Sequence, residues 1–220
     1  MDAPDLDREQ HVQALRALAR INVLSLAAPR VWKKLQTLSR RVDRPLRVLD
    51  VACGGGDMAI AIKSRAERAG LPMEVGGCDI SPVALEFATE RAERRGLEVE
   101  FFQQDAVTEE LPGGYDLVSS SLFLHHLSAP DSVAFLRNLM TAGRVVLVQD
   151  LLRTRIGYLL AMSMVHVITR SPVVRTDGPR SVRAAYSLSE VEDLARKAGL
   201  VGARIQRCWP ERFSLSWQAS

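Results

Sequence analysis

A short apolar run followed by three glycines constrains the fold of this chain more than any other feature. The stretch 46–62 begins with a short apolar run, continues with three glycines at residues 54–56 and ends with an apolar helical pattern. This order predicts a strand, a tight turn and a helix. Because glycine has no Cβ, such a turn can bring backbone N–H groups close to a ligand at the positive end of the helix. We expect a cofactor there, although glycines that only turn the chain are the alternative.

Two classes of cofactor use such a turn. Residues 54–59 satisfy the dinucleotide-binding spacing G-x-G-x-x-[GA], and Asp79 follows the turn by about 20 residues, as a nicotinamide cofactor would require. Asp50, however, stands at the end of the strand, where its carboxylate would repel a pyrophosphate. A carboxylate at that position favours a cationic ligand, and a nicotinamide dinucleotide stays as the alternative.

The motif Asp-x-Ala-Cys-Gly-Gly-Gly-Asp at residues 50–57 resembles the first motif of class I S-adenosylmethionine-dependent methyltransferases. The resemblance covers residues 46–150 by motif and the last two strands by topology. It implies an α/β fold with a seven-stranded, mostly parallel Rossmann-like sheet and a C-terminal antiparallel hairpin. It also implies S-adenosylmethionine as cofactor, which carries a sulfonium and an ammonium group and no phosphate.

The alternation of apolar runs with helical patterns up to residue 150 independently predicts a parallel sheet with right-handed crossovers. After the first strand, we expect further strands at 73–78, 99–103, 115–119, 145–149, 203–208 and 212–218. Helices are expected at 57–69, 83–95 and 131–141, and one with a Ser-x-x-Glu capping box at Ser187 or Ser189.

We divide the chain into an N-terminal helical cap, 1–44, and a methyltransferase domain, 45–220. The cap holds helical patterns at 7–19 and from Pro29 to Leu38. Within the domain, 151–186 is expected to be an insertion that covers the cleft, with an apolar helix at 156–168 and then a loop that contains Pro172 and Gly178-Pro179.

Three aspartates, Asp50, Asp79 and Asp105, each lie at the carboxyl end of a predicted strand, at the edge where an open α/β sheet binds its ligand. The two oxygens of Asp79 can accept both hydroxyl protons of a ribose, and Ile80 can cover a purine face. The resemblance implies that Asp105 accepts the adenine amino proton. The alternatives are an Asp79 that caps its own turn and an Asp105 in a surface loop. The other expected cofactor contacts are Ala52, Gly54, Gly56, Ala106 and Ser121.

Methyl transfer to a hydroxyl requires removal of its proton. A phenol has a pKa of about 10, so a neutral imidazole can serve as general base. His125 and His126 follow the fourth predicted strand. We favour His125 for the substrate and expect His126 to hold the turn or line the cofactor wall, while a purely structural role for both is the alternative. His166 on the apolar helix is a third candidate, with core packing as the alternative.

Residues 122–126 are similar to a stretch in quinone-biosynthesis O-methyltransferases, where a Glu-x-x-Glu-His pattern binds a divalent metal. Here those positions are Leu122, His125 and His126, so the loss of both carboxylates predicts no metal. Tyr186 and four arginines of the insertion could meet an acidic substrate group, or form a solvated face: Arg170, Arg175, Arg180 and Arg183.

Composition excludes several classes of function. The chain is 47% hydrophobic and 25% charged, which is typical of a folded globular protein. Its net charge of +3 is evenly spread and no aromatic platform is visible, so we expect no nucleic-acid partner. The N-terminus is acidic and the apolar stretch 156–168 is too short to span a bilayer, so we expect a cytoplasmic protein without integral membrane association. We also expect a monomer or a homodimer.

We therefore predict a methyltransferase of a small, aromatic, polyketide-like or quinone-like molecule, with O-methylation of a hydroxyl. Carbon methylation of a similar substrate is the near alternative. An NAD-dependent oxidoreductase and a non-catalytic cofactor-binding protein are the alternatives from other classes.

Overall fold

The structure is a computed structural model that describes residues 27–168 and 172–219, without the side chains of 164–177. The helix expected at 7–19 and most of the N-terminal cap lie outside the described residues. A seven-stranded sheet has the order β3-β2-β1-β4-β5-β7-β6. Its strands are β1 (Leu46–Val51), β2 (Met73–Asp79), β3 (Glu100–Gln103), β4 (Leu117–Ser121), β5 (Val145–Leu151), β6 (Arg204–Cys208) and β7 (Arg212–Gln218).

The direction of the strands confirms the predicted fold class. β1 to β5 pair in parallel, whereas β7 pairs antiparallel with both β5 and β6. The helices are α2 (Ala27–Ser39), α3 (Asp57–Arg68), α4 (Pro82–Glu93), the one-turn helix η1 (Leu124–His126), α5 (Ala129–Ala142), α6 (Arg155–Ile168), α7 (Pro172–Ala184) and α8 (Leu188–Ala198).

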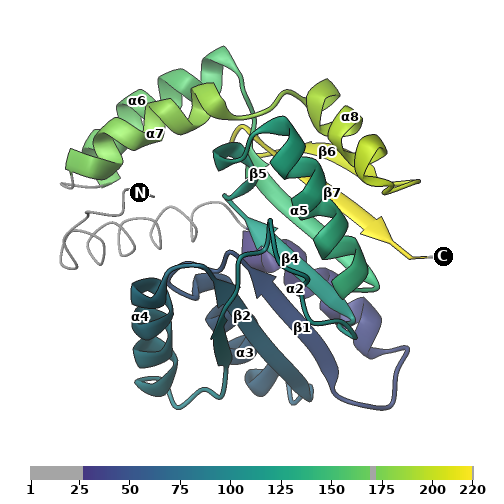
Figure 1. Cartoon of the computed structure of the whole chain (residues 1–220). Coiled ribbons are helices and arrows are strands. Elements are labelled where there is room, and N and C mark those ends of the chain that lie inside the picture. The colour runs from purple at the N-terminus through teal and green to yellow at the C-terminus, as the bar shows by residue number, and fades with distance from the viewer. Residues whose placement is uncertain (1–26, 169–171, 220) are drawn as a thin grey trace.

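The sheet separates two apolar cores. Successive side chains of a strand point to opposite faces, so Val48 packs with α2 and α3 while its neighbour Leu49 packs with α5 and α8. In Figure 1, α6 and α7 lie beyond the end of the sheet at which β5 finishes. The carboxyl ends of the parallel strands therefore lie on the side of the insertion.

Local sequence signals set the helix starts. The Ser81 hydroxyl accepts the Ala84 N–H over 3.3 Å at the start of α4. At α8 the capping box forms at Ser187 and not at the alternative Ser189, since the Glu190 carboxylate accepts the Ser187 N–H over 2.7 Å.

The prediction of a loop that contains Pro172 and Gly178-Pro179 was wrong, because these residues belong to α7. Pro172 stands at the first helical position, where no N–H is required, but Pro179 lies inside the helix and removes one backbone hydrogen bond. Packing of α7 against α6 and η1 offsets that loss. The insertion thus contacts the turn that carries His125.

Candidate functional site

The glycine turn between β1 and α3 has no room for larger side chains. Gly56 has φ +70°, and a Cβ there would lie 2.8 Å from Phe101 Cζ and 2.9 Å from Ala88 Cβ. Ala52 also has a left-handed φ, of 54°, which is uncommon for a residue with a Cβ. Such strain is often retained at ligand sites, and here it lies at the predicted cofactor turn.

Asp50 places a buried carboxylate directly before this turn. The side chain is 2% exposed, and its Oδ1 accepts the Ser119 hydroxyl over 3.1 Å. Burial raises the pKa of Asp50, the hydrogen bond from Ser119 lowers it and the charges of Asp57 and Asp79 raise it, and together they bring it to about 7. Three carboxylates around one turn would repel a phosphate and stabilise a cation, so the residues present fit the sulfonium and ammonium groups of S-adenosylmethionine.

Asp79 ends β2 beside the turn. Its Oδ2 accepts the Gly54 N–H over 2.8 Å, and its Oδ1 accepts the Ser81 N–H over 3.0 Å. Each carboxylate oxygen has more than one lone pair, so these bonds orient Asp79 while leaving capacity for hydroxyl donors. Ile80, which comes next, is 60% exposed, as a side chain that covers a purine would be. The ribose and purine roles remain predictions.

Asp105 follows β3, and the bond from the Gln104 N–H to the Asp79 carbonyl brings it to the same edge. Its carboxylate accepts the Thr108 hydroxyl over 2.7 Å and the Val107 N–H over 2.9 Å. The Thr108 hydrogen bond holds the pKa of Asp105 below its usual value. The loop-capping alternative explains these contacts, and the adenine contact stays a prediction. Ala106 is buried in the same loop, and Ser121 ends β4.

Sequence reasoning missed Arg91, which fixes the glycine turn. From α4, its Nη1 donates to the Gly55 carbonyl over 2.6 Å and lies 2.6 Å from Asp57 Oδ1. Arg91 thus clamps the turn and offsets one of the three carboxylate charges. The sequence carries no signal for this contact, since Arg91 is one of several charged residues on an exposed-looking helix.

His125 is paired with Asp150 at the end of β5. The distance from His125 Nδ1 to Asp150 Oδ1 is 2.6 Å, and the His125 backbone N–H donates to Asp150 Oδ2 over 3.1 Å. Burial raises the pKa of Asp150, but the charge and hydrogen bonds of His125 outweigh it, so the pKa is lowered overall. An ionised Asp150 holds the proton of the neutral imidazole on Nδ1, and Nε2 is therefore the nitrogen that can accept one.

The sequence analysis also did not predict Asp150 as a site residue, although its position in the sequence pointed to one. Like Asp50 and Asp79, it directly follows an apolar strand, and the same reasoning would have placed it at the ligand edge.

The other predicted catalytic candidates take different positions. The His126 ring stacks on His125 with centroids 4.1 Å apart. His166 belongs to α6, but its side chain lies outside the described residues. Tyr186 donates its hydroxyl hydrogen to the Leu127 carbonyl over 2.8 Å, so it anchors the histidine turn to the insertion.

Of the arginines predicted to meet an acidic group, two can be described. Arg183 donates to the Tyr158 hydroxyl over 3.0 Å and is exposed, as is Arg180. Arg170 and the side chain of Arg175 lie outside the described residues.

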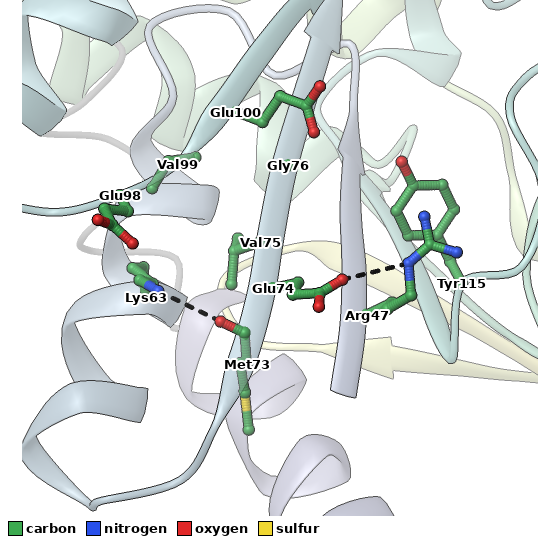
Figure 2. Close-up of a pocket in the computed structure, with 10 residues that line it drawn as sticks. All are labelled: Arg47, Lys63, Met73, Glu74, Val75, Gly76, Glu98, Val99, Glu100 and Tyr115. Carbon is green, nitrogen blue, oxygen red and sulfur yellow. Dashed lines mark hydrogen bonds and ion pairs between the residues drawn. The ribbon is translucent and has the colours of Figure 1, made fainter. Parts of the chain in front are cut away.

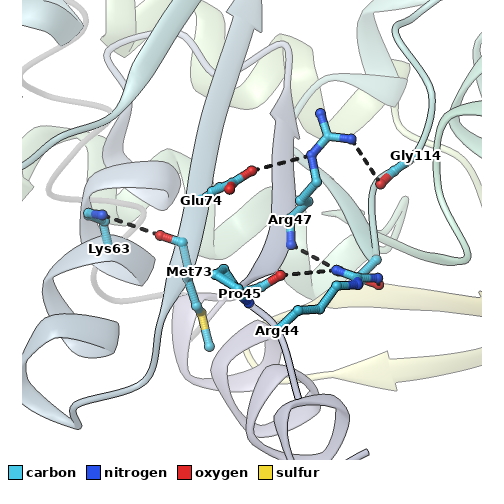
Figure 3. Close-up of polar contacts among 8 residues, drawn as sticks. Arg44, Pro45, Arg47, Lys63, Met73, Glu74 and Gly114 are labelled. Carbon is cyan, nitrogen blue, oxygen red and sulfur yellow. Dashed lines mark hydrogen bonds and ion pairs between the residues drawn. The ribbon is translucent and has the colours of Figure 1, made fainter. Parts of the chain in front are cut away.

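A cavity of about 460 Å³ lies at the opposite edge of the sheet, where β1 and β2 begin (Figure 2). Arg47 Nε lies 3.4 Å from Glu74 Oε2, and Lys63 Nζ donates to the Met73 carbonyl over 3.2 Å. Figure 3 adds the bond from Arg47 to the Gly114 carbonyl. Because Asp50 lies at the other end of β1, this cavity is separate from the candidate cofactor site.

Residues 27–168 and 172–219 contain no helix with the length and apolar character needed to cross a bilayer. They also contain no group of three or more His, Cys, Asp or Glu residues placed to hold a metal ion.

Comparison with known proteins identifies the family of this chain. Residues 48–144 match a family described as a methyltransferase domain. The chain is 33% identical over 130 residues to a demethylmenaquinone methyltransferase of Thermus thermophilus, covering 58% of this chain and 57% of the relative. It is 30% identical over 178 residues to a ubiquinone biosynthesis O-methyltransferase of Burkholderia pseudomallei, covering 77% of this chain and 72% of the relative. The chain thus spans little more than half of the Thermus relative.

Solved structures share the fold. A methyltransferase from Aquifex aeolicus superposes with a TM-score of 0.64 at 19% identity, covering 98% of this chain and 100% of that chain. Magnesium protoporphyrin IX methyltransferase from Synechocystis, solved with bound S-adenosylhomocysteine, gives a TM-score of 0.58 at 18% identity, covering 96% of this chain and 84% of that chain. From its family match, its relatives and its fold, this chain belongs to the S-adenosylmethionine-dependent methyltransferases.

Proposed function

We propose that this protein transfers a methyl group to a hydroxyl of a small aromatic molecule, with His125 as general base. The observation that carries the proposal is the buried pair of His125 and Asp150, 2.6 Å apart, at the edge of the sheet that holds the cofactor turn. S-adenosylmethionine supplies an electrophilic methyl group when bound. Asp50, Asp79 and the glycine turn provide the acceptors and N–H donors that suit its charged and polar groups.

The protein's own task is to align the acceptor, exclude water and remove one proton. Asp150 keeps the proton of His125 on Nδ1, so Nε2 takes the proton of the acceptor hydroxyl as the oxygen becomes nucleophilic. After the proton moves, Asp150 stabilises the imidazolium cation. Burial of the pair strengthens that stabilisation, because the local dielectric constant is low.

Two further features support a small, largely apolar acceptor. The relatives are named a demethylmenaquinone methyltransferase and a ubiquinone biosynthesis O-methyltransferase. Residues 151–186, which we propose as the cap insertion, present apolar side chains on α6, of which Ile156 and Leu159 are 58% and 64% exposed. We propose that residues 1–44 form the second part of the cap and that residues 45–220 form the catalytic domain. We also propose that the protein acts in the cytoplasm.

A turnover assay tests the proposal. Purified protein is mixed with S-adenosylmethionine and a panel of catechols and hydroquinones, S-adenosylhomocysteine release is measured, and the product is identified by NMR. His125→Ala should lower kcat by about 10²- to 10⁴-fold, the usual contribution of a general base, while S-adenosylhomocysteine binding is kept. Asp150→Asn, which keeps the side-chain shape, should also lower kcat.

His126→Asn is the comparison variant, because it changes the adjacent imidazole that stacks on His125. Loss of turnover in His126→Asn with full activity in His125→Ala would refute the assignment of the base. A methyl group found on carbon would refute O-methylation and leave the methyltransferase activity intact.

A further inference from the structure

Ser119 lies opposite Asp50 in the sheet and donates a hydrogen bond to it. The register of β1 and β4 pairs the two residues, and the Ser119 hydroxyl donates to Asp50 Oδ1 over 3.1 Å. Both residues are almost fully buried, with exposures of 1% for Ser119 and 2% for Asp50. The contact is therefore a hydrogen bond to a carboxylate in a low-dielectric environment, where it is stronger than in water.

The next residue along β4, Ser120, provides an internal comparison. Because side chains alternate along a strand, Ser120 points to the other face of the sheet, on which Val118 packs with α5. Ser120 is 2% exposed, and its Oγ has no hydrogen-bond partner in the part of the chain that the structure describes. Two adjacent serines are thus buried to a similar degree, but the Ser119 hydroxyl has an ionisable partner and the Ser120 hydroxyl does not.

The surroundings of Asp50 oppose its ionisation. Burial raises its pKa, and the negative charges of Asp57 on α3 and Asp79 on β2 act in the same direction. The neighbouring thiols of Cys53 and Cys78 stay neutral, because burial raises their own pKa values. None of these groups supplies a positive charge that would favour the Asp50 carboxylate.

Two neutral donors act against burial. The Ser119 hydroxyl and the backbone N–H of Ala59, in the first turn of α3, both lower the pKa of Asp50, and Ser119 has the larger effect. Donors of this kind favour the charged form of the carboxyl group that accepts their hydrogen bonds. Without the Ser119 hydroxyl, Asp50 would therefore keep its proton to a higher pH.

We propose that Ser119 is a positioning residue for the cofactor, because its hydroxyl holds Asp50 in the carboxylate form that pairs with the ammonium group of S-adenosylmethionine. The inference rests on the cofactor site of the proposed function, and it requires neither the acceptor nor His125. Ser119 acts through Asp50 from a strand 69 positions further along the chain.

Two ligands test the proposal: S-adenosylhomocysteine, which carries the ammonium group, and 5′-methylthioadenosine, which lacks it. Each is titrated calorimetrically into the full chain between pH 5.5 and 8.5. In the wild type, affinity for S-adenosylhomocysteine should rise with a midpoint at the Asp50 pKa of about 7. Affinity for 5′-methylthioadenosine should not show this rise.

Ser119→Ala should move the midpoint up by about one pH unit, as expected for the loss of one hydrogen bond to a charged group. Binding of S-adenosylhomocysteine should then be about eightfold weaker than in the wild type at pH 6.5, and less than about twofold weaker at pH 8.5. Ser120→Ala removes the adjacent hydroxyl and should leave the midpoint unchanged. If Ser119→Ala does not fold, Ser119→Cys takes its place, because a thiol is only a weak donor.

A midpoint that stays near 7 in the Ser119 variant would overturn the proposal, and so would the same shift in Ser120→Ala. An equal loss of 5′-methylthioadenosine affinity would also overturn it, because Ser119 would then support the shape of the site and not the charge of Asp50. In an Asp50→Asn background, Ser119→Ala should change affinity no further, since the group through which it acts is gone. A further loss in the double variant would contradict the positioning role.

These titrations separate the inference from the proposed reaction. A shifted midpoint in a protein that methylates no phenol refutes O-methylation alone. Methyl transfer with an unshifted midpoint refutes the role of Ser119 alone.

Discussion

The pKa of Asp50 predicts how cofactor affinity depends on pH. Burial raises this pKa from 3.8 to about 7, a shift of about three units. At about 1.4 kcal/mol per unit, ionising Asp50 without a bound cation costs roughly 4 kcal/mol more than ionising an exposed aspartate. Below pH 7 the unliganded protein therefore carries a protonated Asp50, which must lose its proton before it can pair with an ammonium group.

Affinity for S-adenosylhomocysteine should accordingly rise with pH and level off above the pKa. With a pKa of about 7, the ionised fraction of Asp50 is roughly 25-fold larger at pH 7.5 than at pH 5.5, and the dissociation constant should change by the same factor. Calorimetric titration across this range measures it. Asp50→Asn should bind weakly at all these pH values, while Glu67→Gln, on the exposed side of α3, should keep the wild-type profile.

Thermal unfolding of the unliganded protein gives a second readout. Because the folded pKa is raised, Asp50 stabilises the fold below its unfolded pKa, and this contribution disappears as pH rises through about 7. A wild-type affinity that does not change with pH, or the same pH dependence in Asp50→Asn, would refute the reasoning.

Three further substitutions test the clamp, the turn and the core. Arg91→Met removes the two 2.6 Å contacts that fix the turn, so it should raise KM for S-adenosylmethionine about tenfold and leave kcat unchanged. The control variant Arg95→Met should leave KM unchanged. An equal fall in kcat in Arg91→Met would contradict a positioning role. Gly56→Ala would place a Cβ 2.8 Å from Phe101 and should abolish binding of S-adenosylhomocysteine, which calorimetric titration measures. Asp116→Ala breaks a bidentate pair with Arg44 and should lower the free energy of unfolding in urea by about 2 kcal/mol at pH 7. Burial raises the pKa of Asp116, but its hydrogen bonds outweigh burial and lower this pKa overall. The loss of stability should therefore shrink as pH falls below 4, where Asp116 of the wild type becomes protonated and its pair with Arg44 weakens.

Much of the fold followed from signals between residues close in the chain. The apolar run that starts at Leu46 and the glycines at 54–56 predicted a strand, a turn and a helix, and β1 and α3 flank the turn in that order. Hydrophobic periodicity and capping residues act over three or four positions, so the sequence alone contains them. The aspartates at strand ends followed in the same way, because a parallel sheet brings the carboxyl ends of its strands to one edge.

The sequence did not predict α7, because Pro179 is a strong local signal against a helix. Its effect is outweighed by packing on α6, a contact that depends on the whole insertion. Arg91 was missed for a similar reason, since its partners are 36 and 34 positions away along the chain.

The sequence by itself determined a methyltransferase-type sheet, an acidic glycine turn and a pair of adjacent histidines. Only the tertiary structure distinguished the two histidines, because η1 directs His125 onto Asp150, which arrives from β5, the strand beside β4. It also set Ser119 of β4 opposite Asp50 of β1. Pairing between strands far apart in sequence decides which charges meet in a low-dielectric interior, and no local pattern encodes that pairing.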